Sequence, residues 1–300
     1  MRTNQAPTTE RLQIFGPLFT VAPDLSRVRE LTNDNEAETL AFLGVRPVHT
    51  VVMTSFVRDN GIESLLNRGK FFGYRNAQGG LEGVALIGHT TLVEAQNDEA
   101  LKALAFTARS TTTPIHLIMS GGDAATSFWN YLHGGSKAPS LKGTELLFET
   151  AFPFPVQQCE YDLRSARPEE LEAVAVAQAE VAEIECGINP MVKDREGFLR
   201  RVMRRIEQGR IFVVFEDGDL VFKADIIAET DSVAYLEGVY VGVEHRGKGI
   251  GSKCLSKLNV QLLSRVQNVC LLSNVEFKGV HKTFLKAGMR RTGECTTLFV

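Results

Sequence analysis

The sequence predicts an α/β protein built from two modules of similar plan, each with a mixed sheet flanked by helices. Two observations support this prediction. Between Tyr235 and Leu258, an apolar strand, a glycine-rich turn and an amphipathic helix follow one another. The strands and helices that precede this stretch have counterparts about 140 residues earlier, as expected of an internal repeat.

The C-terminal module combines two early helices with a series of strands. A helix is expected from Pro168, because proline suits the first turn of a helix, and a second helix over residues 194–208 ends at Gly209. The dipeptide Asp217-Gly218 between apolar runs is typical of a hairpin. The strands of this module are expected at residues 161–165, 211–215, 220–228, 233–241 and 269–273.

The N-terminal module repeats the middle of this plan. Residues 69–72 (Gly-Lys-Phe-Phe) correspond to residues 209–212 (Gly-Arg-Ile-Phe). Between Val93 and Asp98 there is neither a glycine nor an arginine, so we expect no anion-binding turn in this half. Three roles stay open for the N-terminal half: shaping the substrate cleft, forming a homodimer or binding another ligand. Its further strands are expected at residues 81–93, 115–120 and 145–150, and its helices at residues 98–107 and 124–132.

Composition and charge narrow the class of protein. The chain has 300 residues, enough for two domains, with 33 basic and 36 acidic residues and a formal net charge of −3. This balance lacks the basic field of a nucleic-acid-binding protein, and no apolar run is long enough to span a membrane. The five cysteines form no Cys-x-x-Cys pair, so we expect reduced thiols and no metal site. Because the N-terminus lacks an apolar signal segment, a cytoplasmic location is expected.

The turn between the strand and the helix suits a phosphate group. It contains Arg246, Gly247, Lys248, Gly249 and Gly251. Glycines let an anion approach the free N–H groups of the first helical turn, and the two cations add positive charge beside them. A glycine-rich turn without a ligand is the alternative interpretation.

Two familiar phosphate motifs do not fit this turn. A magnesium-binding P-loop needs Ser or Thr at the position that Gly249 occupies. A dinucleotide fingerprint needs Gly-x-Gly-x-x-Gly and an acidic residue about 20 positions later, and the chain has neither. The pattern Arg/Gln-x-x-Gly-x-Gly/Ala fits without adjustment from Arg246 to Gly251.

That pattern, after a Val-x-Val strand and before an amphipathic helix, resembles the coenzyme A pyrophosphate loop of the GNAT N-acetyltransferase superfamily. The resemblance covers roughly the last 140 residues. It includes residues 283–289 (Thr-Phe-Leu-Lys-Ala-Gly-Met), where the family has its Tyr-x-x-x-Gly-Phe ending. It implies a central, mostly antiparallel sheet that is splayed between two parallel strands. On this basis we expect a disordered tail at residues 1–10, a degenerate GNAT-like domain at 11–152, a connector at 153–160 and an acetyltransferase domain at 161–300.

The resemblance also implies where acetyl-CoA binds. The cleft lies between the strands at residues 233–241 and 269–273. Backbone groups of the first strand pair with the pantetheine arm and polarise the thioester carbonyl, and the glycine-rich turn holds the pyrophosphate. The residues assigned to the cofactor in this way are Val239, Tyr240, Val241, Arg246, Gly247, Lys248, Gly249, Ile250, Gly251, Ser252, Asn274 and Phe284.

Glu237 is the candidate catalytic base, because an amine acceptor must lose a proton before it attacks the thioester. It stands in a Leu-Glu-Gly stretch similar to that of several family members, including some aminoglycoside acetyltransferases. A cross-strand salt bridge is the alternative role. Phe284 stands where the family often has a tyrosine, so the leaving thiolate would take its proton from water. His245 and the arginines of the helix at residues 194–208 are expected to be solvated.

Together these features predict an acetyl-CoA-dependent N-acetyltransferase. Transfer to a primary amine would be direct, in a ternary complex, since no cysteine is placed to carry the acetyl group. The acceptor is a small-molecule or peptide amine that the sequence does not specify further. Two alternatives stay open. One is a non-catalytic acyl-CoA-binding sensor or scaffold, and the other is a nucleotide-binding protein that resembles the family only at the loop.

Overall fold

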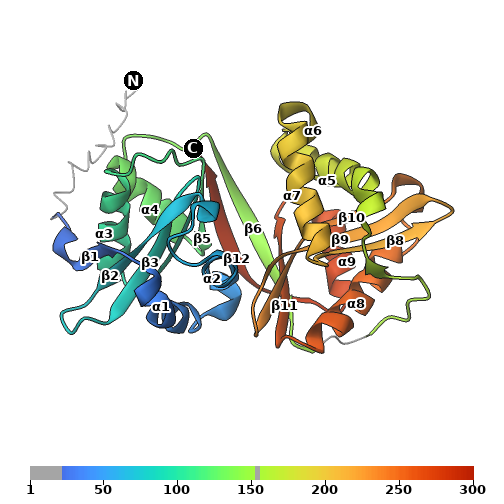
Figure 1. The fold of residues 1–300 in the computed structure, drawn as a ribbon, viewed down its shortest axis with the longest axis horizontal. Coiled ribbons are helices and arrows are strands. Elements are labelled where there is room, and N and C mark those ends of the chain that lie inside the picture. The colour runs from blue at the N-terminus through green and yellow to red at the C-terminus, as the bar shows by residue number, and fades with distance from the viewer. Residues whose placement is uncertain (1–21, 153–155) are drawn as a thin grey trace, which may run out of the picture.

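One continuous β-sheet runs through both halves of the molecule. The computed structural model describes residues 22–152 and 156–300. The tail expected at residues 1–10 lies outside these described residues, as do positions 153–155 of the expected connector. In the described parts of the chain, twelve strands pair in the order β1-β2-β3-β4-β5-β12-β6-β11-β10-β9-β8-β7. Figure 1 shows the sheet passing from the N-terminal half, through β12 and β6 in the middle, into the C-terminal half.

Each half of the chain contributes six of these strands. The first half contributes β1 (Val28–Glu30), β2 (Gly69–Arg75), β3 (Leu81–Gly88), β4 (Thr90–Ala95), β5 (Leu117–Gly121) and β6 (Leu141–Thr150). The second contributes β7 (Arg164–Ser165), β8 (Ile211–Glu216), β9 (Asp219–Glu229), β10 (Val233–Val241), β11 (Asn268–Asn274) and β12 (Arg290–Phe299). The pairs β4–β5 and β10–β11 are parallel, one in each half, and the other pairs are antiparallel. The predicted mixed α/β fold with two modules is therefore confirmed.

Helices cover both faces of the sheet. One face carries α1 (Glu36–Leu43), α2 (Pro47–Asn60), α5 (Leu171–Cys186), α6 (Pro190–Lys193) and α7 (Arg195–Glu207). The other face carries α3 (Asp98–Ala108), α4 (Ala124–His133), α8 (Ile250–Leu263) and α9 (Lys278–Lys286). Side chains alternate between these layers along each strand. In β10, Leu236 packs on the α8 side, whereas Val233 and Tyr235 pack with Val51 of α2.

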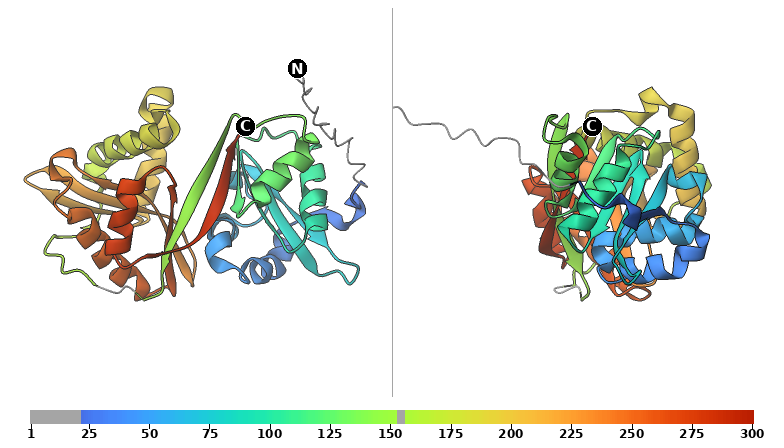
Figure 2. Two further views of the ribbon diagram at one scale, coloured as in Figure 1. Left: turned by 180° about the vertical axis from the view of Figure 1, so that it is seen from behind. Right: turned by 90° about the vertical axis from the view of Figure 1, so that its left-hand side faces the viewer.

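The last strand of each half pairs with the other half. Strand β6 aligns with β11 from Glu145 opposite Asn274 to Thr150 opposite Val269. Strand β12 pairs with β6 on one side and with β5 on the other. Strands β6 and β12 lie side by side in the middle of the molecule (Figure 2). The sheet thus crosses the domain boundary expected at residue 152, and β6 extends the C-terminal half of the sheet.

Helix α2 also joins the two halves. It belongs to the first half of the chain but packs against β9 and β10 of the second. Ion pairs lie at this junction, between Arg58 and Asp231 at 2.5 Å and between Arg210 and Asp59 at 2.8 Å. Within the described part of the chain, none of the helices has the length and apolar character needed to cross a membrane.

Candidate functional site

A cavity opens where two parallel strands diverge. Strands β10 and β11 pair from Val233 opposite Asn268 to Leu236 opposite Leu271. Both strands then continue without pairing to each other, to Val241 and Asn274. A cavity of about 640 Å³ lies in this opening, between β10, β11, α5, α8 and α9. It is the larger of two described below.

A β-bulge shapes the wall of this cavity. Glu237 aligns with Asp225 of β9 and Tyr240 aligns with Lys223, so two residues of β10 lie opposite one of β9. Gly238 is one of the two, with a φ of +59°. A Cβ there would lie 2.6 Å from Oε1 of Gln178 and 3.0 Å from Nζ of Lys223, so the position requires glycine. The rest of β10 then turns along the cavity.

The N-terminus of α8 lies at one end of the cavity. Gly249 begins this helix with a φ of +78°, no side chain of the described residues caps its first N–H groups, and its first turn contains no acidic residue. Such an end attracts anions, because the free N–H groups coincide with the positive end of the helix dipole. The Ser252 hydroxyl donates to the Gly249 carbonyl at 3.0 Å, which helps to close the first turn.

Cationic side chains surround the same end. Lys282 and Lys286 of α9 line the cavity together with Arg246. Nε of Arg246 donates to the Val241 carbonyl at 2.9 Å, and its Nη2 lies 3.0 Å from Oε1 of Glu180. The sequence analysis did not identify the two lysines. Their spacing of four residues in a helix that follows a cleft strand would have indicated them.

Most of the residues that the resemblance assigned to coenzyme A lie along the cavity. Among the described residues that line it, Lys248 and Asn274 are missing. Asn274 instead accepts a hydrogen bond from the Glu276 backbone N–H at 2.9 Å and so caps the turn into α9. Those that do line it are Val239, Tyr240, Val241, Arg246, Gly247, Gly249, Ile250, Gly251, Ser252 and Phe284, and the candidate base Glu237 lines it too.

Phe284 has two kinds of neighbour. Its side chain lines the cavity, but it is only 3% exposed and belongs to the core cluster between the sheet and α8. Its ring meets that of Phe148 of β6 edge to face, with centroids 5.3 Å apart. Phe284 therefore packs as a core aromatic side chain whose edge forms part of the cavity wall.

The opposite end of the cavity is acidic. The Glu237 carboxylate accepts a hydrogen bond from the Tyr235 hydroxyl at 2.7 Å. It faces the cavity and is accessible through it, but the surrounding protein partly desolvates it and so raises its pKa, although Tyr235 and Arg205 act in the opposite direction. Glu185 of α5 lines the same end. Glu185 is open to the cavity, but partial desolvation by the surrounding protein and the negative charges of Glu237 and Glu145 raise its pKa to about 7.

Glu185 was missed in the sequence analysis. It follows Glu180 and Glu183 in one helix, and such a run is typical of a solvated helix face. Only the packing of α5 beside β10 distinguishes Glu185 from these neighbours. A carboxyl group whose pKa lies near neutrality in a cavity is a candidate for proton transfer or cation binding.

A buried ion pair lies beneath Glu237. Nζ of Lys223 lies 2.6 Å from Oδ1 of Asp225, and both side chains are almost completely buried. Lys223 also donates to Oε1 of Gln178 at 2.5 Å and to the carbonyl of Gly238 at 3.3 Å, which holds the bulge in place. Arg205 reaches Asp225 from α7 at 3.2 Å. Burial lowers the pKa of Lys223, while its partner Asp225 opposes that change.

The other arginines of α7 stay at the surface. Arg200 and Arg201 pair with the acidic residues Glu196 and Asp194 at the start of the same helix. They are exposed, as the sequence predicted for a solvated helix face. Arg205 differs from them because it is directed inward to Asp225.

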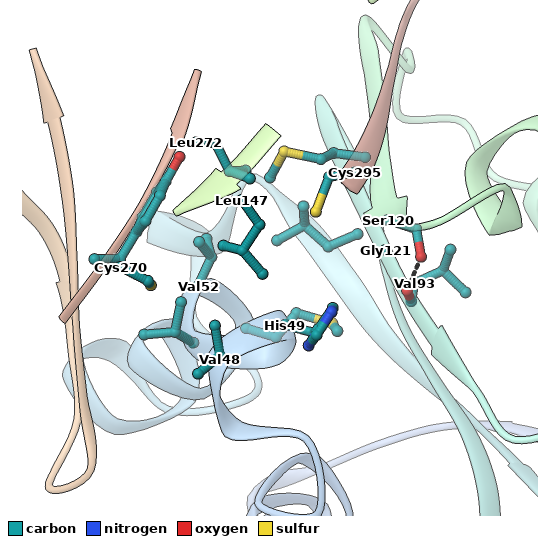
Figure 3. Close-up of a pocket in the computed structure, with 15 residues that line it drawn as sticks. Val48, His49, Val52, Val93, Ser120, Gly121, Leu147, Cys270, Leu272 and Cys295 are labelled. Carbon is teal, nitrogen blue, oxygen red and sulfur yellow. Dashed lines mark hydrogen bonds between the residues drawn. The ribbon is translucent and has the colours of Figure 1, made fainter. Parts of the chain in front are cut away.

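The N-terminal half has a corresponding strand divergence, and the cavity beside it is much smaller. Strands β4 and β5 pair from Thr90 to Leu92 and then separate. The Ser120 hydroxyl bridges the gap by donating to the Val93 carbonyl at 2.8 Å (Figure 3). A small, mostly apolar cavity of about 40 Å³ is left beside it, lined among others by His49, Cys270 and Cys295.

The metal-ligating residue types do not gather in the described residues. No group of three or more His, Cys, Asp or Glu side chains there is arranged to hold a metal ion. Cys159, Cys254, Cys270 and Cys295 are free thiols. Burial raises the pKa of Cys270 and Cys295.

Comparison with solved structures shows what the whole chain is similar to in fold. It is similar to a GNAT-family acetyltransferase from Colwellia psychrerythraea (14% identity, 91% of this chain and 98% of that chain covered, TM-score 0.59). It is also similar to a GCN5-related N-acetyltransferase from Sphaerobacter thermophilus (13%, 90% and 93%, TM-score 0.58). A tandem GNAT protein from the clavulanic acid biosynthesis pathway matches as well (13%, 91% and 98%, TM-score 0.57). At these identities the similarity concerns the fold.

Comparison by sequence gives a narrower match. No curated protein matches the chain. Residues 147–275, which run from within β6 to the residue after β11, match the acetyltransferase (GNAT) family model. This segment contains β10, the glycine-rich turn and α8, and so contains the part of the larger cavity that these elements line. The chain therefore carries a domain of the GNAT acetyltransferase family at residues 147–275.

Proposed function

We propose that this protein is an acetyl-CoA-dependent N-acetyltransferase that acts on a primary amine. The family supports acyl-CoA-dependent acyl transfer in general. The observation that carries the narrower proposal is the charge of the larger cavity, which is cationic at the α8 end and acidic beside Glu237 and Glu185. An anionic donor and a cationic acceptor suit these two ends, and they would meet where β10 and β11 diverge.

The donor end fits coenzyme A. The N–H groups at the start of α8 and the side chains of Lys282 and Lys286 suit the phosphates. The backbone of Val239, Tyr240 and Val241 lies along the cavity and suits the pantetheine arm. Bound acetyl-CoA supplies the acetyl group as a thioester. A backbone N–H of β10 stabilises the negative charge that develops on the carbonyl oxygen.

Glu237 accepts the proton of the amine. The acceptor binds as an ammonium ion, and only the free amine can attack, so a carboxylate must take a proton from it, directly or through a water. The raised pKa of Glu237 makes it a stronger base than a glutamate of ordinary pKa. Among the described cysteines none lines the larger cavity, which favours direct transfer in a ternary complex. Coenzyme A leaves as a thiolate that water protonates, since Phe284 has no proton to give.

The test is the substitution Glu237→Gln in the full chain. We expect turnover of a responsive amine to fall by about 10²- to 10⁴-fold, measured by release of coenzyme A thiol. Thermal-shift titration should show that acetyl-CoA still binds. Glu183→Gln is a matched control, because Glu183 lies on α5 outside the cavity and accepts a hydrogen bond from Asn189.

Two results would contradict the proposal. Unchanged turnover in Glu237→Gln would remove Glu237 as the base. Binding of acetyl-CoA by the unsubstituted protein without acetylation of any amine in a broad panel would instead favour a sensor or scaffold.

A further inference from the structure

We propose that the acceptor is an aliphatic diamine or polyamine, whose second ammonium group is held by Glu185, with the negative charge of Glu145 behind it, while its first reacts beside Glu237. This inference rests on the proposed function and specifies the substrate class of the same site. The cavity and the family domain support acyl transfer without these carboxylates, and the proposed function uses the acidic end only to favour an amine. The further step is that this end holds a second ammonium group.

The three carboxylates come from three elements on one face of the sheet. Glu237 belongs to β10 and Glu185 to α5, and both line the cavity. Glu145 belongs to β6, two residues before Leu147, which packs with Tyr235 on the α2 side. Side chains two residues apart in a strand share a face, so Glu145 lies on the same face as Tyr235 and Glu237.

Glu145 acts on the other two electrostatically. Its pKa is raised by burial and by the negative charge of Glu237, and its own charge contributes to the raised pKa of Glu185. It is only partly exposed and is not part of the cavity lining, so it lies behind the other two. Because β6 comes from the first half of the chain, that half contributes directly to the charge of the site.

The negative charge of this group is not neutralised within the protein. In the described parts of the chain, none of Glu145, Glu185 and Glu237 belongs to an ion pair. Lys223 and Arg205 act electrostatically on Glu237. Lys223 is already bound to Asp225, Gln178 and the Gly238 carbonyl, and Arg205 is already paired with Asp225. A cationic ligand would relieve a repulsion that the fold leaves in place.

The position of Glu185 at the C-terminal end of α5 also favours a cationic ligand. It is the penultimate residue of α5, and no basic residue lies in the last turn of that helix. Carboxylates are disfavoured at the C-terminal end of a helix, where the dipole is negative, and cations are favoured there. The helix end and Glu185 therefore attract the same kind of ligand.

The reacting ammonium group cannot provide a lasting electrostatic attraction to these carboxylates, whereas a second ammonium group can. The reacting amine gives up a proton and becomes an amide, so it does not keep the charge that bound it. A second ammonium group stays charged throughout. Val181 and Ile184 line the cavity beside Glu185, and their apolar side chains suit the methylene chain between two amines.

The experiment compares a diamine with a monoamine of similar length. Full-length protein with acetyl-CoA is assayed on 1,4-diaminobutane, spermidine and 1-aminopentane. We expect kcat/KM for the two polycations to exceed that for the monoamine by about tenfold or more, which is the ratio that one charge-assisted contact gives. Glu185→Gln and Glu145→Gln should each reduce this ratio, chiefly through KM. The surface control Glu183→Gln should leave it unchanged.

The possible failures can be told apart. Equal kcat/KM for diamine and monoamine, or a ratio that neither substitution changes, overturns this inference and leaves the N-acetyltransferase proposal standing. Preference for a basic peptide over spermidine also overturns it. If acetyl-CoA binds but no amine is acetylated, the proposed function and this inference fall together. Melting curves of each variant establish that a lost preference is not a loss of folding.

Discussion

The two parallel strand pairs of this protein are alike in topology and different in what they leave open. In each half, two strands pair for three or four residues and then separate. In the C-terminal half the separation leaves a cavity of about 640 Å³, and in the N-terminal half only about 40 Å³ remains nearby. Ser120 bridges β4 and β5, whereas no such bridge joins β10 and β11 in the described structure beyond Leu236.

The connections that follow these strands differ as well. Residues 242–249 connect β10 to α8, but only Gln96 and Asn97 connect β4 to α3. The Asn97 side chain caps the Ala100 N–H at 2.9 Å, and Asp98 and Glu99 occupy the first turn of α3. The N–H groups and the dipole of α3 are thus satisfied from within the chain, and an anion would meet two carboxylates. We therefore propose that the C-terminal divergence binds an anionic ligand and the N-terminal one does not, because only the C-terminal one is followed by a helix end without a side-chain cap among the described residues.

The largest effect is expected from Gly249→Asp. This substitution puts a side chain on a backbone with a φ of +78° and a negative charge at the start of α8. Affinity for coenzyme A should fall by about 100-fold or more, because charge-assisted contacts to the phosphates are lost. Isothermal titration of each variant measures this.

Gly218→Asp provides the matched control for that measurement. Gly218 also has a positive φ, +92°, and no atom lies within 4 Å of a Cβ at its position in the β8–β9 turn. It should bind coenzyme A like the unsubstituted protein. Equal binding by Gly249→Asp and the unsubstituted protein would place the phosphates elsewhere.

A smaller effect is expected from Glu185→Gln, which should change how the Tm of the protein depends on pH. The folded protein keeps the Glu185 proton up to about pH 7, whereas an unfolded chain releases it near the ordinary pKa of 4.5. Rising pH between these values therefore favours unfolding, and glutamine removes that dependence. The variant should gain about one degree in Tm relative to the unsubstituted protein between pH 5 and pH 8, and little below pH 5, because solvent reaches the Glu185 side chain and weakens the effect. Parallel Tm curves would contradict the shifted pKa; Glu183→Gln is the control.

The smallest effect on ligand binding is expected from Ser120→Ala. Loss of the hydrogen bond to Val93 should lower stability by about 1 kcal/mol, or about 2 °C in Tm. The number of coenzyme A molecules bound should not change, because α3 still presents its own cap and carboxylates. Ser264→Ala, which removes an exposed hydroxyl at the end of α8, is the control. Binding of a second coenzyme A by Ser120→Ala would show that the hydrogen bond alone closes the N-terminal half.

Local sequence signals were sufficient for much of the fold and for one end of the site. The turn from Arg246 to Gly251 combines glycines, cations and a helix start within a few residues, so it is readable without long-range information. The exchange of β6 and β12 was not predicted. Both strands keep the same alternation whichever neighbour they pair with, so their sequences do not specify the partner.

The acidic end was only partly predictable for a similar reason. Glu237 was found because it stands in the same strand as the cleft backbone. Glu185 and Glu145 reach that end from α5 and from a strand about 90 positions before Glu237 in the chain, and only the packed sheet brings them together. Lys223 and Asp225 break the apolar pattern of β9 and could have indicated a buried polar network, but their neighbours Gln178 and Arg205 come from helices.

The measurement that tests the central difference most directly is the stoichiometry of coenzyme A binding to the full chain by isothermal titration. We predict one molecule per chain, with binding lost in Gly249→Asp and retained in Gly218→Asp. Two molecules per chain, or binding that survives Gly249→Asp unchanged, would contradict the proposal that only the C-terminal strand divergence forms a coenzyme A site.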